Sequence, residues 1–420
     1  MPTLGNPLDR KFLGDTAWNY GAFAVMAATG VILNFFIAWR FGTAALGVFN
    51  QIYAVYMVMA QLAVFGVHDS AQKYVAEHAG DAAALLAIQR AAVVLAVVIG
   101  AGVAIVVWAA SGIIGRLAAS TPVGLGVELA APGMALFAIN KVLMGILNGA
   151  RRMRAFALVQ GGRVLSILGF ALLVAVQDWQ PHVLGAAFTV AEALIILPLL
   201  ILVRPWQTGV AAALATRDWI GRHLDFGVRA LPNGFLAESY VRVDVLMLAV
   251  FVDDAAIGVY SFAAMFIEGL YQVPVVVRTV VNPVLVKLAA TADRPALARF
   301  SRRVMAASLA VFIGAALMVH MIFPFLTPWF ADGLVAGARD VLMPLTIGLG
   351  LYAGFVPLDY ILMQAGMPGR QSALMALNIT INIVLNLALI PSFGIMGAAL
   401  ATAASFALAA LTLNLAVWRW

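Results

Sequence analysis

The chain of 420 residues is 64% hydrophobic and only 10% charged, with a formal net charge of +6. Soluble globular proteins carry about 25% charged residues, so this composition excludes a soluble globular fold and favours a chain that lies mainly in a lipid bilayer. The absence of cysteine excludes disulfides, thiolate metal sites and cysteine nucleophiles.

The apolar segments, taken in chain order, predict about twelve membrane-spanning helices. Glycine, proline and charged clusters separate them, and the first is too long for the apolar core of a cleaved signal peptide. The expected spans are 16–39, 45–67, 86–110, 127–149, 156–176, 183–203, 226–252, 256–281, 303–326, 338–363, 371–390 and 394–417. Since each span needs about 20 apolar residues, only short loops remain. The predicted fold class is therefore an all-α polytopic membrane protein.

Lysine and arginine, which cytoplasmic loops retain, indicate the orientation of these spans. With the N-terminus in the cytoplasm, 17 of the 25 basic residues lie on the cytoplasmic side, and only Arg40, Arg116 and Arg339 lie on the other. We therefore expect a multi-pass protein of the bacterial inner membrane with both termini in the cytoplasm. The positive charge then reflects topology, and no nucleic-acid partner is expected.

The longest interruption between spans, 204–222, divides the chain near its middle. It predicts an N-terminal six-helix bundle at 1–203, a cytoplasmic linker at 204–225 and a C-terminal six-helix bundle at 226–420. Within the linker, the apolar stretch 211–215 and Trp219 favour a helix at the membrane interface.

The two halves repeat each other at a separation near 211 residues. Residues 44–49 (AALGVF) match 255–260 (AAIGVY), and 185–187 match 397–399, both of which read GAA. Six spans followed by six in the same orientation predict two bundles related by a pseudo-two-fold axis along the membrane normal. Transporters with such repeats commonly move their cargo by alternating access.

Three sequence motifs carry a family resemblance. The first runs from Arg40 through 46–49 (LGVF), the second from Asp244 to 257–261 (IGVYS), and the third from Pro391 to 397–402 (GAALAT). In these motifs the chain resembles the polysaccharide-exporter branch of the multidrug/oligosaccharidyl-lipid/polysaccharide (MOP) exporter superfamily, which includes the Wzx-type O-antigen flippases. Phe41 departs from the leucine that is usual in the first motif.

The resemblance implies a non-enzymatic flippase that translocates an undecaprenyl diphosphate-linked oligosaccharide for surface polysaccharide biosynthesis. Its implied partners are the lipid-linked oligosaccharide and membrane lipids, with a polysaccharide polymerase and chain-length proteins as further candidates. No cofactor is expected, because the five histidines have no metal-ligand spacing and no ATP-binding loop is present.

Ionisable residues within the spans are candidates for function, because each costs roughly 2.5–3.5 kcal/mol to insert. The basic ones are Lys141, Arg163, Arg229, Arg242 and Arg278, and the acidic ones are Glu192, Glu238, Asp244, Glu268 and Asp359. We expect Lys141, Arg242 and Arg278 to face a cavity and neutralise the lipid diphosphate. Arg163 and Arg229 lie near the cytoplasmic face, where snorkelling to the surface explains them.

The carboxylates have two interpretations. Glu192, Glu238, Asp244 and Glu268 are candidates for binding a proton or a sodium ion that drives transport, or each is a permanent partner of a basic residue. Glu238 and Arg242 are four residues apart and share a helix face, which predicts a pair, whereas Asp244 points elsewhere.

Asn378, Asn382 and Asn386 recur every four residues and form a polar stripe on one helix. Carboxamides suit sugar hydroxyls, so Asn378 and Asn382 are candidate substrate contacts. Interhelical hydrogen bonding is the simpler competing interpretation.

Other functions remain as alternatives. A drug/cation antiporter of the MATE branch shares the expected fold, although the intramembrane basic residues argue against cationic cargo. A lipid II flippase usually has two additional helices. The loop 68–73 lacks the signature of a major-facilitator transporter, which argues against that class here. A membrane-bound polysaccharide polymerase or ligase would need a larger outer loop than this chain has.

Overall fold

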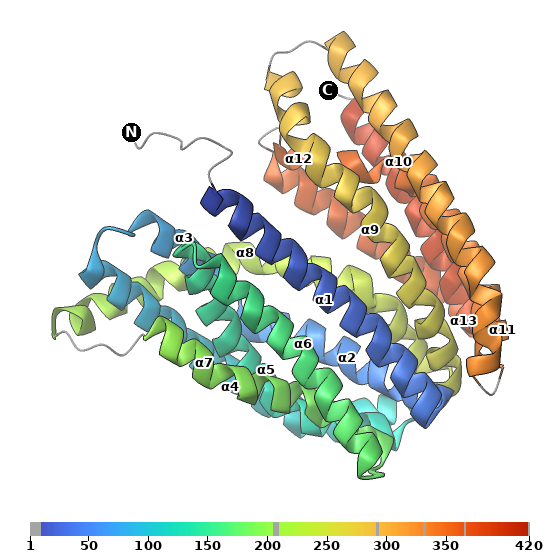
Figure 1. The fold of residues 1–420 in the computed structure, drawn as a ribbon, viewed down its shortest axis with the longest axis horizontal. Coiled ribbons are helices and arrows are strands. Elements are labelled where there is room, and N and C mark those ends of the chain that lie inside the picture. The colour runs from blue at the N-terminus through green and yellow to red at the C-terminus, as the bar shows by residue number, and fades with distance from the viewer. Residues whose placement is uncertain (1–9, 205–209, 291–293, 331–332, 365–366, 419–420) are drawn as a thin grey trace. The chain divides into compact units, whose positions relative to one another are not determined.

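The computed structural model describes residues 10–204, 210–290, 294–330, 333–364 and 367–418 (Figure 1). Within these ranges the chain forms α-helices, short 3-10 helices and turns, and no strand. The α-helices of the first half are α1 (Arg10–Phe41), α2 (Thr43–Val64), α3 (Val67–Glu77), α4 (Ala82–Leu117), α5 (Thr121–Gly149), α6 (Met153–Val176) and α7 (Ala186–Val203). Those of the second half are α8 (Val210–Phe251), α9 (Asp254–Ala290), α10 (Arg294–Ile322), α11 (Leu334–Ala353), α12 (Ile361–Gln364) and α13 (Pro368–Trp418). The 3-10 helices are η1 (Pro181–Gly185), η2 (Phe323–Trp329) and η3 (Val356–Leu358).

The described residues contain ten helices that are long and apolar enough to cross a membrane. Two differences from the predicted spans account for the lower number. The span expected at 226–252 lies in α8, where Glu238, Arg242 and Asp244 interrupt its apolar character. The last two expected spans lie in the single helix α13. The predicted all-α, multi-pass membrane fold is confirmed.

Helix α13 is two helical segments joined at Gly394. This glycine has φ 55° and ψ −132°, which is not helical, and it follows Pro391. A methyl group at Gly397 would overlap the carbonyl oxygen of Leu389, so the chain turns sharply here. The glycines of the third motif therefore have a steric role, and the break agrees with the boundary predicted between 390 and 394.

The contacts between residues divide the chain into two compact units. Unit 1 comprises Met1–Ile37 and Ile52–Glu238, and unit 2 comprises Ala38–Gln51 and Ser239–Trp420. Helix α8 continues unbroken from Val210 through the second half of the predicted linker. Trp219 is buried there against Tyr74 of α3, with ring centroids 5.2 Å apart, so it does not lie free at a membrane interface.

Unit 1 is a bundle in which α5 has the most neighbours. It packs against α3, α4 and α7, and α6 packs against α7 (Figure 1). Ser120 begins α5 by accepting a hydrogen bond from the backbone N–H of Val123. Large side chains such as Val98, Ile105 and Val106 of α4 are exposed, as expected for a helix face in contact with lipid.

In unit 2, α9 packs against α10 and α11, and α11 packs against α13. This unit also contains the contact between the two copies of the first repeat. A methyl group at Gly47 would overlap the carbonyl oxygen of Asp254, and one at Gly258 would overlap that of Thr43. Thr43 and Asp254, like Gly47 and Gly258, are 211 residues apart. The contact is therefore reciprocal, with equivalent residues on each side.

Candidate functional site

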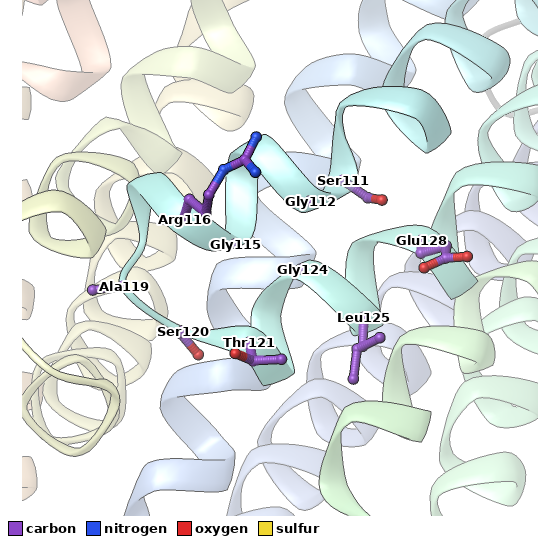
Figure 2. Close-up of a pocket in the computed structure, with 10 residues that line it drawn as sticks. All are labelled: Ser111, Gly112, Gly115, Arg116, Ala119, Ser120, Thr121, Gly124, Leu125 and Glu128. Atoms are coloured by element: carbon purple, nitrogen blue, oxygen red, sulfur yellow. The ribbon is translucent and has the colours of Figure 1, made fainter.

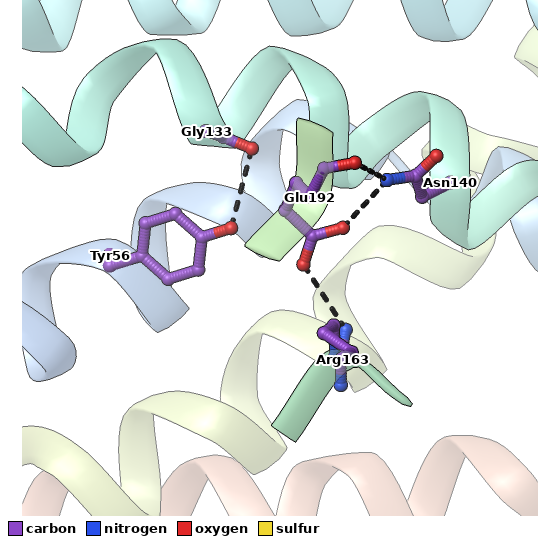
Figure 3. Close-up of polar contacts among 5 residues, drawn as sticks. All are labelled: Tyr56, Gly133, Asn140, Arg163 and Glu192. Carbon is purple, nitrogen blue, oxygen red and sulfur yellow. Dashed lines mark hydrogen bonds and ion pairs between the residues drawn. The ribbon is translucent and has the colours of Figure 1, made fainter. Parts of the chain in front are cut away.

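Glu192 of α7 is the centre of a buried polar cluster in unit 1 (Figure 3). It is 2% exposed. Asn140 of α5 donates hydrogen bonds from Nδ2 to Oε2 of Glu192 at 2.8 Å and to its backbone carbonyl at 2.9 Å. On the other side, Nη1 of Arg163 in α6 lies 3.6 Å from Oε1 of Glu192. One carboxylate thus joins three helices of the bundle.

Aromatic rings cover this cluster. The Phe137 ring lies within 5.3 Å of the Arg163 guanidinium carbon and 5.9 Å of the Lys141 ammonium. Tyr56 packs edge-on against Phe137 and donates a hydrogen bond to the Gly133 carbonyl oxygen at 3.3 Å. The rings limit access of water, which strengthens the electrostatic interactions among the charged groups.

Lys141, a predicted substrate contact, is half-buried in α5 beside this cluster. Within the described part of the chain, no carboxylate lies within 4.0 Å of its ammonium group. Arg163, Glu238, Asp69 and Glu192 are close enough to interact with it electrostatically. The ammonium therefore lies over an aromatic face, with no direct ionic partner among the described residues.

The expectation that Arg163 snorkels is wrong. Its side chain is only 16% exposed, because Glu192 provides a partner inside the bundle. Arg229 does lie at the surface: its side chain is 72% exposed and it forms an ion pair with Asp225, one helical turn earlier.

Asp244 of α8 is the centre of a different cluster, in unit 2. Its Oδ2 accepts hydrogen bonds from Thr402 Oγ1 at 2.6 Å and Tyr260 OH at 2.8 Å, and its Oδ1 accepts one from Asn386 Nδ2 at 2.8 Å. No cationic side chain lies within 4.0 Å of it in the described residues. Among the described residues, the donors to this carboxylate are all neutral.

The partners of Asp244 explain the sequence motifs. Asp244 begins the second motif, Tyr260 also belongs to it, and Thr402 ends the third. The motifs indicated a family resemblance, but they did not predict that their residues meet at one carboxylate. Spacing could not reveal this because Asn386 and Thr402 are more than 140 residues from Asp244 along the chain.

The predicted pair between Glu238 and Arg242 is not formed. Arg242 instead donates from Nη1 to Oε1 of Glu268 in α9, at 3.1 Å. The Arg242 side chain is 15% exposed and the Glu268 side chain 49% exposed, so the pair is open on the carboxylate side. An ion pair with α9 therefore takes the place of the pair that the i, i+4 spacing predicted.

Arg278, the third predicted cationic contact, is also paired. Its Nη1 lies 2.9 Å from both carboxylate oxygens of Asp359, and its guanidinium carbon lies 4.5 Å from the centre of the Tyr360 ring. Both charged side chains are less than 20% exposed. Among the three predicted cationic contacts, only Lys141 has no carboxylate partner within the described residues.

Each asparagine of the predicted stripe makes an interhelical contact within the two segments of α13 or with α8. Asn378 accepts from Thr412 Oγ1 at 3.2 Å, and Asn382 Nδ2 lies 3.4 Å from Thr402 Oγ1. Asn386 bonds to Asp244 and donates to Asn382 Oδ1 at 3.1 Å. These contacts favour the interhelical interpretation over direct sugar binding by Asn378 and Asn382.

No group of three or more His, Asp or Glu side chains suited to a metal ion occurs in the described ranges. A groove of about 430 Å³ lies at the turn between α4 and α5, and none of its lining residues belongs to either cluster (Figure 2). It is lined in part by Ser111, Arg116 and Glu128. The charged clusters are therefore not part of this groove.

Comparison with known proteins identifies the fold. No protein-family model matches the chain, and a search of curated proteins gives no match. Solved structures do match. "Lipid II flippase MurJ, inward closed conformation" has a TM-score of 0.79 at 15% identity, covering 94% of this chain and 86% of that one. An inward-facing multidrug resistance MATE family transporter of the MOP superfamily has a TM-score of 0.73 at 15% identity, covering 93% of both chains.

A MOP superfamily transporter from Pyrococcus furiosus, described as having a binding pocket of reverse polarity, has a TM-score of 0.60 at 11% identity. It covers 94% of this chain, which covers 93% of it. The protein thus has the twelve-helix fold of MOP superfamily transporters, over nearly its whole length. The identities are too low to transfer a substrate from any of them.

Proposed function

We propose that this protein is a flippase that translocates an undecaprenyl diphosphate-linked oligosaccharide across the bacterial inner membrane for surface polysaccharide biosynthesis. The MOP transporter fold and the three Wzx-like motifs support this assignment. A lipid-linked oligosaccharide unites a hydrocarbon tail, an anionic diphosphate and sugar hydroxyls. Its transporter therefore needs positive charge and polar groups at membrane depth.

The observation that carries the proposal is the environment of Lys141. An ammonium at membrane depth without a direct carboxylate partner is costly unless a ligand or water compensates it. The Phe137 face contributes an attraction of about 0.5–2 kcal/mol, less than the roughly 2.5–3.5 kcal/mol cost of inserting such a charge. A diphosphate passing the cluster supplies the missing negative charge. Arg242 and Arg278 would interact with it only in competition with their carboxylates.

Asp244 is the best of the four candidate coupling residues. Within the described residues, Glu192 and Glu268 have arginine partners and Glu238 has no hydrogen bond, whereas Asp244 is surrounded by neutral polar groups. Asn386 Oδ1 is buried without a hydrogen-bond partner beside it. Carboxylate, amide and hydroxyl oxygens suit Na⁺, and an uncompensated carboxylate suits H⁺. Cation binding at Asp244 would link the ion gradient to alternating exposure of the cargo.

In this proposal both termini lie in the cytoplasm, because that orientation places most arginines and lysines inside. The lipid-linked oligosaccharide arrives from enzymes on the cytoplasmic side. After translocation it would pass to a polysaccharide polymerase and chain-length proteins outside.

A MATE-type drug/cation antiporter is the second candidate, favoured by the TM-score of 0.73 to a multidrug resistance transporter. The two candidates differ in the charge of the cargo. An antiporter of organic cations gains nothing from an unpaired ammonium, so replacing Lys141 should leave or improve cation export while it impairs a flippase.

The decisive experiment measures translocation of a fluorescent lipid-linked oligosaccharide in proteoliposomes containing the purified protein. We expect K141Q and R242Q to lower the rate about fivefold, corresponding to about 1 kcal/mol each. K73Q, which alters an exposed lysine outside the cluster, should retain the wild-type rate. Normal flux in both K141Q and R242Q would overturn the proposal, and so would export of organic cations by the wild type without lipid translocation.

A further inference from the structure

A second basic site lies outside the clusters described above, at the turn between α5 and α6. A pocket of about 350 Å³ is lined by Arg151, Arg152, Met153, Arg154, Ala155 and Leu158. The turn is tightly built: Arg151 has φ 54°, and the Arg152 backbone N–H donates to the Leu147 carbonyl oxygen at 2.8 Å. Three arginines in four residues are thereby held around one pocket.

The three arginine side chains differ in the contacts that they make within the protein. Arg152 donates from Nη1 to the Leu202 carbonyl oxygen at the end of α7, at 2.6 Å. The Arg154 guanidinium carbon lies 5.1 Å from the centre of the Trp18 ring. None of the three has a carboxylate within 4.0 Å in the parts of the chain that the structure describes. The pocket therefore concentrates positive charge that no ion pair within the described residues neutralises.

The first turn of α6 adds to this positive potential. Its N-cap residue, Arg152, forms no side-chain capping hydrogen bond, and the N-terminal end of a 24-residue helix carries a partial positive charge. The remaining wall is apolar, since Met153 and the exposed Leu158 line the pocket. A ligand that matches both the positive charge and the apolar side chains of this pocket has an anionic group attached to hydrocarbon.

We propose that this pocket binds the phosphate headgroup of an anionic membrane phospholipid. Arginine pairs with phosphate through two parallel hydrogen bonds, and Arg151 and Arg154 are the residues available for this contact. Basic pockets between membrane helices are suited to anionic headgroups, and tryptophan beside them is typical of the membrane interface. The acyl chains would extend along Leu158 and the outer face of α6. This site does not depend on the proposed transport function.

The test measures lipid binding to the delipidated, full-length protein by native mass spectrometry. Phosphatidylglycerol is the anionic probe and phosphatidylcholine the comparison. We expect the wild type to prefer phosphatidylglycerol, and R151Q/R154Q to bind it about tenfold more weakly with phosphatidylcholine binding unchanged. Arg152 is left intact because it holds the end of α7. R151K/R154K, which keeps the charge, should recover part of the affinity.

The matched control is R302Q/R303Q, which removes two adjacent exposed arginines of α10. It should retain the preference of the wild type. Equal losses in the two double variants would overturn the proposal, since they would indicate general electrostatic attraction. Retained binding in R151Q/R154Q would also overturn it.

Two further probes separate the sources of phosphate. Millimolar inorganic phosphate should displace little phosphatidylglycerol, and displacement by it alone would mean a simple anion site. A short polyprenyl diphosphate should compete no better than phosphatidylglycerol. Stronger competition would assign the pocket to a lipid diphosphate and overturn the phospholipid assignment.

Discussion

The two units of the molecule each surround one carboxylate with hydrogen-bond partners, but the partners differ, and Glu192 is buried whereas Asp244 is half-buried. Glu192 in unit 1 lies between an amide and a guanidinium, so an opposite charge compensates its own. Asp244 in unit 2 receives three hydrogen bonds, all from neutral groups. A compensated carboxylate is suited to holding helices together, whereas an uncompensated one is suited to taking up and releasing a cation. The two carboxylates therefore differ in the charge of their partners among the described residues.

The largest effect should come from removing the charge of Glu192. E192Q preserves shape but leaves Arg163 uncompensated, and breaking such a pair costs about 3 kcal/mol of folding stability. Unfolding in detergent micelles measures the loss. E192Q/R163Q should recover most of it, and E77Q, which opens the exposed Lys73–Glu77 pair, should cost less than about 1 kcal/mol. Wild-type stability in E192Q would remove the contrast between the two carboxylates.

His223 offers a third environment, buried but outside the predicted spans. It is fully buried, with Nδ1 2.6 Å from Ser70 Oγ and Nε2 3.2 Å from the Ile88 carbonyl oxygen. Burial lowers the pKa of His223 from 6.5 to about 4, so the folded protein keeps the imidazole neutral. The unfolded chain takes up the proton first as the pH falls below 6.5. Stability present above pH 6.5 is then lost progressively towards pH 4.

By pH 5 this loss should reach about 2 kcal/mol. Thermal unfolding of the wild type and H223Q between pH 7.5 and 4.5 measures it, since glutamine retains a donor and an acceptor without titrating in this range. S70A should lower stability at every pH while keeping the slope. The same pH dependence in H223Q and the wild type would contradict the assignment to His223.

Replacing Asp244 should affect transport more than folding. D244N keeps the size of the side chain but removes the negative charge that attracts a cation. We expect transport driven by an ion gradient to fall at least about tenfold, equivalent to about 1.4 kcal/mol, while the unfolding temperature changes little. Proteoliposomes with imposed Na⁺ or proton gradients provide the measurement. A D244N protein that still responds to the gradient would show that another group carries the ion.

The smallest effect should come from one donor to Asp244, and its sign identifies the ion. T402V removes a hydroxyl that favours the charged carboxylate and whose oxygen is also a potential Na⁺ ligand. A contribution of about 1 kcal/mol corresponds to about a fivefold change. Proton binding should become tighter in T402V, whereas Na⁺ binding should become weaker. An unchanged affinity for both ions would place the coupling site elsewhere.

The spans could be predicted from the sequence, but the side-chain partners could not. Hydrocarbon requires each crossing segment to satisfy its own backbone, so apolar length alone locates most helices. Partner choice depends on how helices are rotated against one another. Arg242 therefore bonds to Glu268 in another helix although Glu238 is only one turn away. The pairing of Arg163 with Glu192 and of Arg278 with Asp359 also depends on helix rotation, so it could not be predicted from the sequence.

The limits of the linker were harder to predict from the sequence, for a related reason. The charged stretch 204–222 is a break in hydropathy, yet α8 continues through its second half, where Trp219 and the nearby His223 are buried in contact with α3 and α4. The local composition predicts only how exposed a segment would be if it were isolated. It cannot predict that a helix distant in the sequence packs against the segment and buries it.

The reciprocal contact of Gly47 and Gly258 has a consequence for the origin of the chain. Two identical molecules that associate about a dyad meet through equivalent residues, as these two glycines do. The contact has the reciprocal geometry that a symmetric homodimer shows at its two-fold axis. Substitutions on one side of this crossing would then be constrained by the other, so the two copies have had to diverge together.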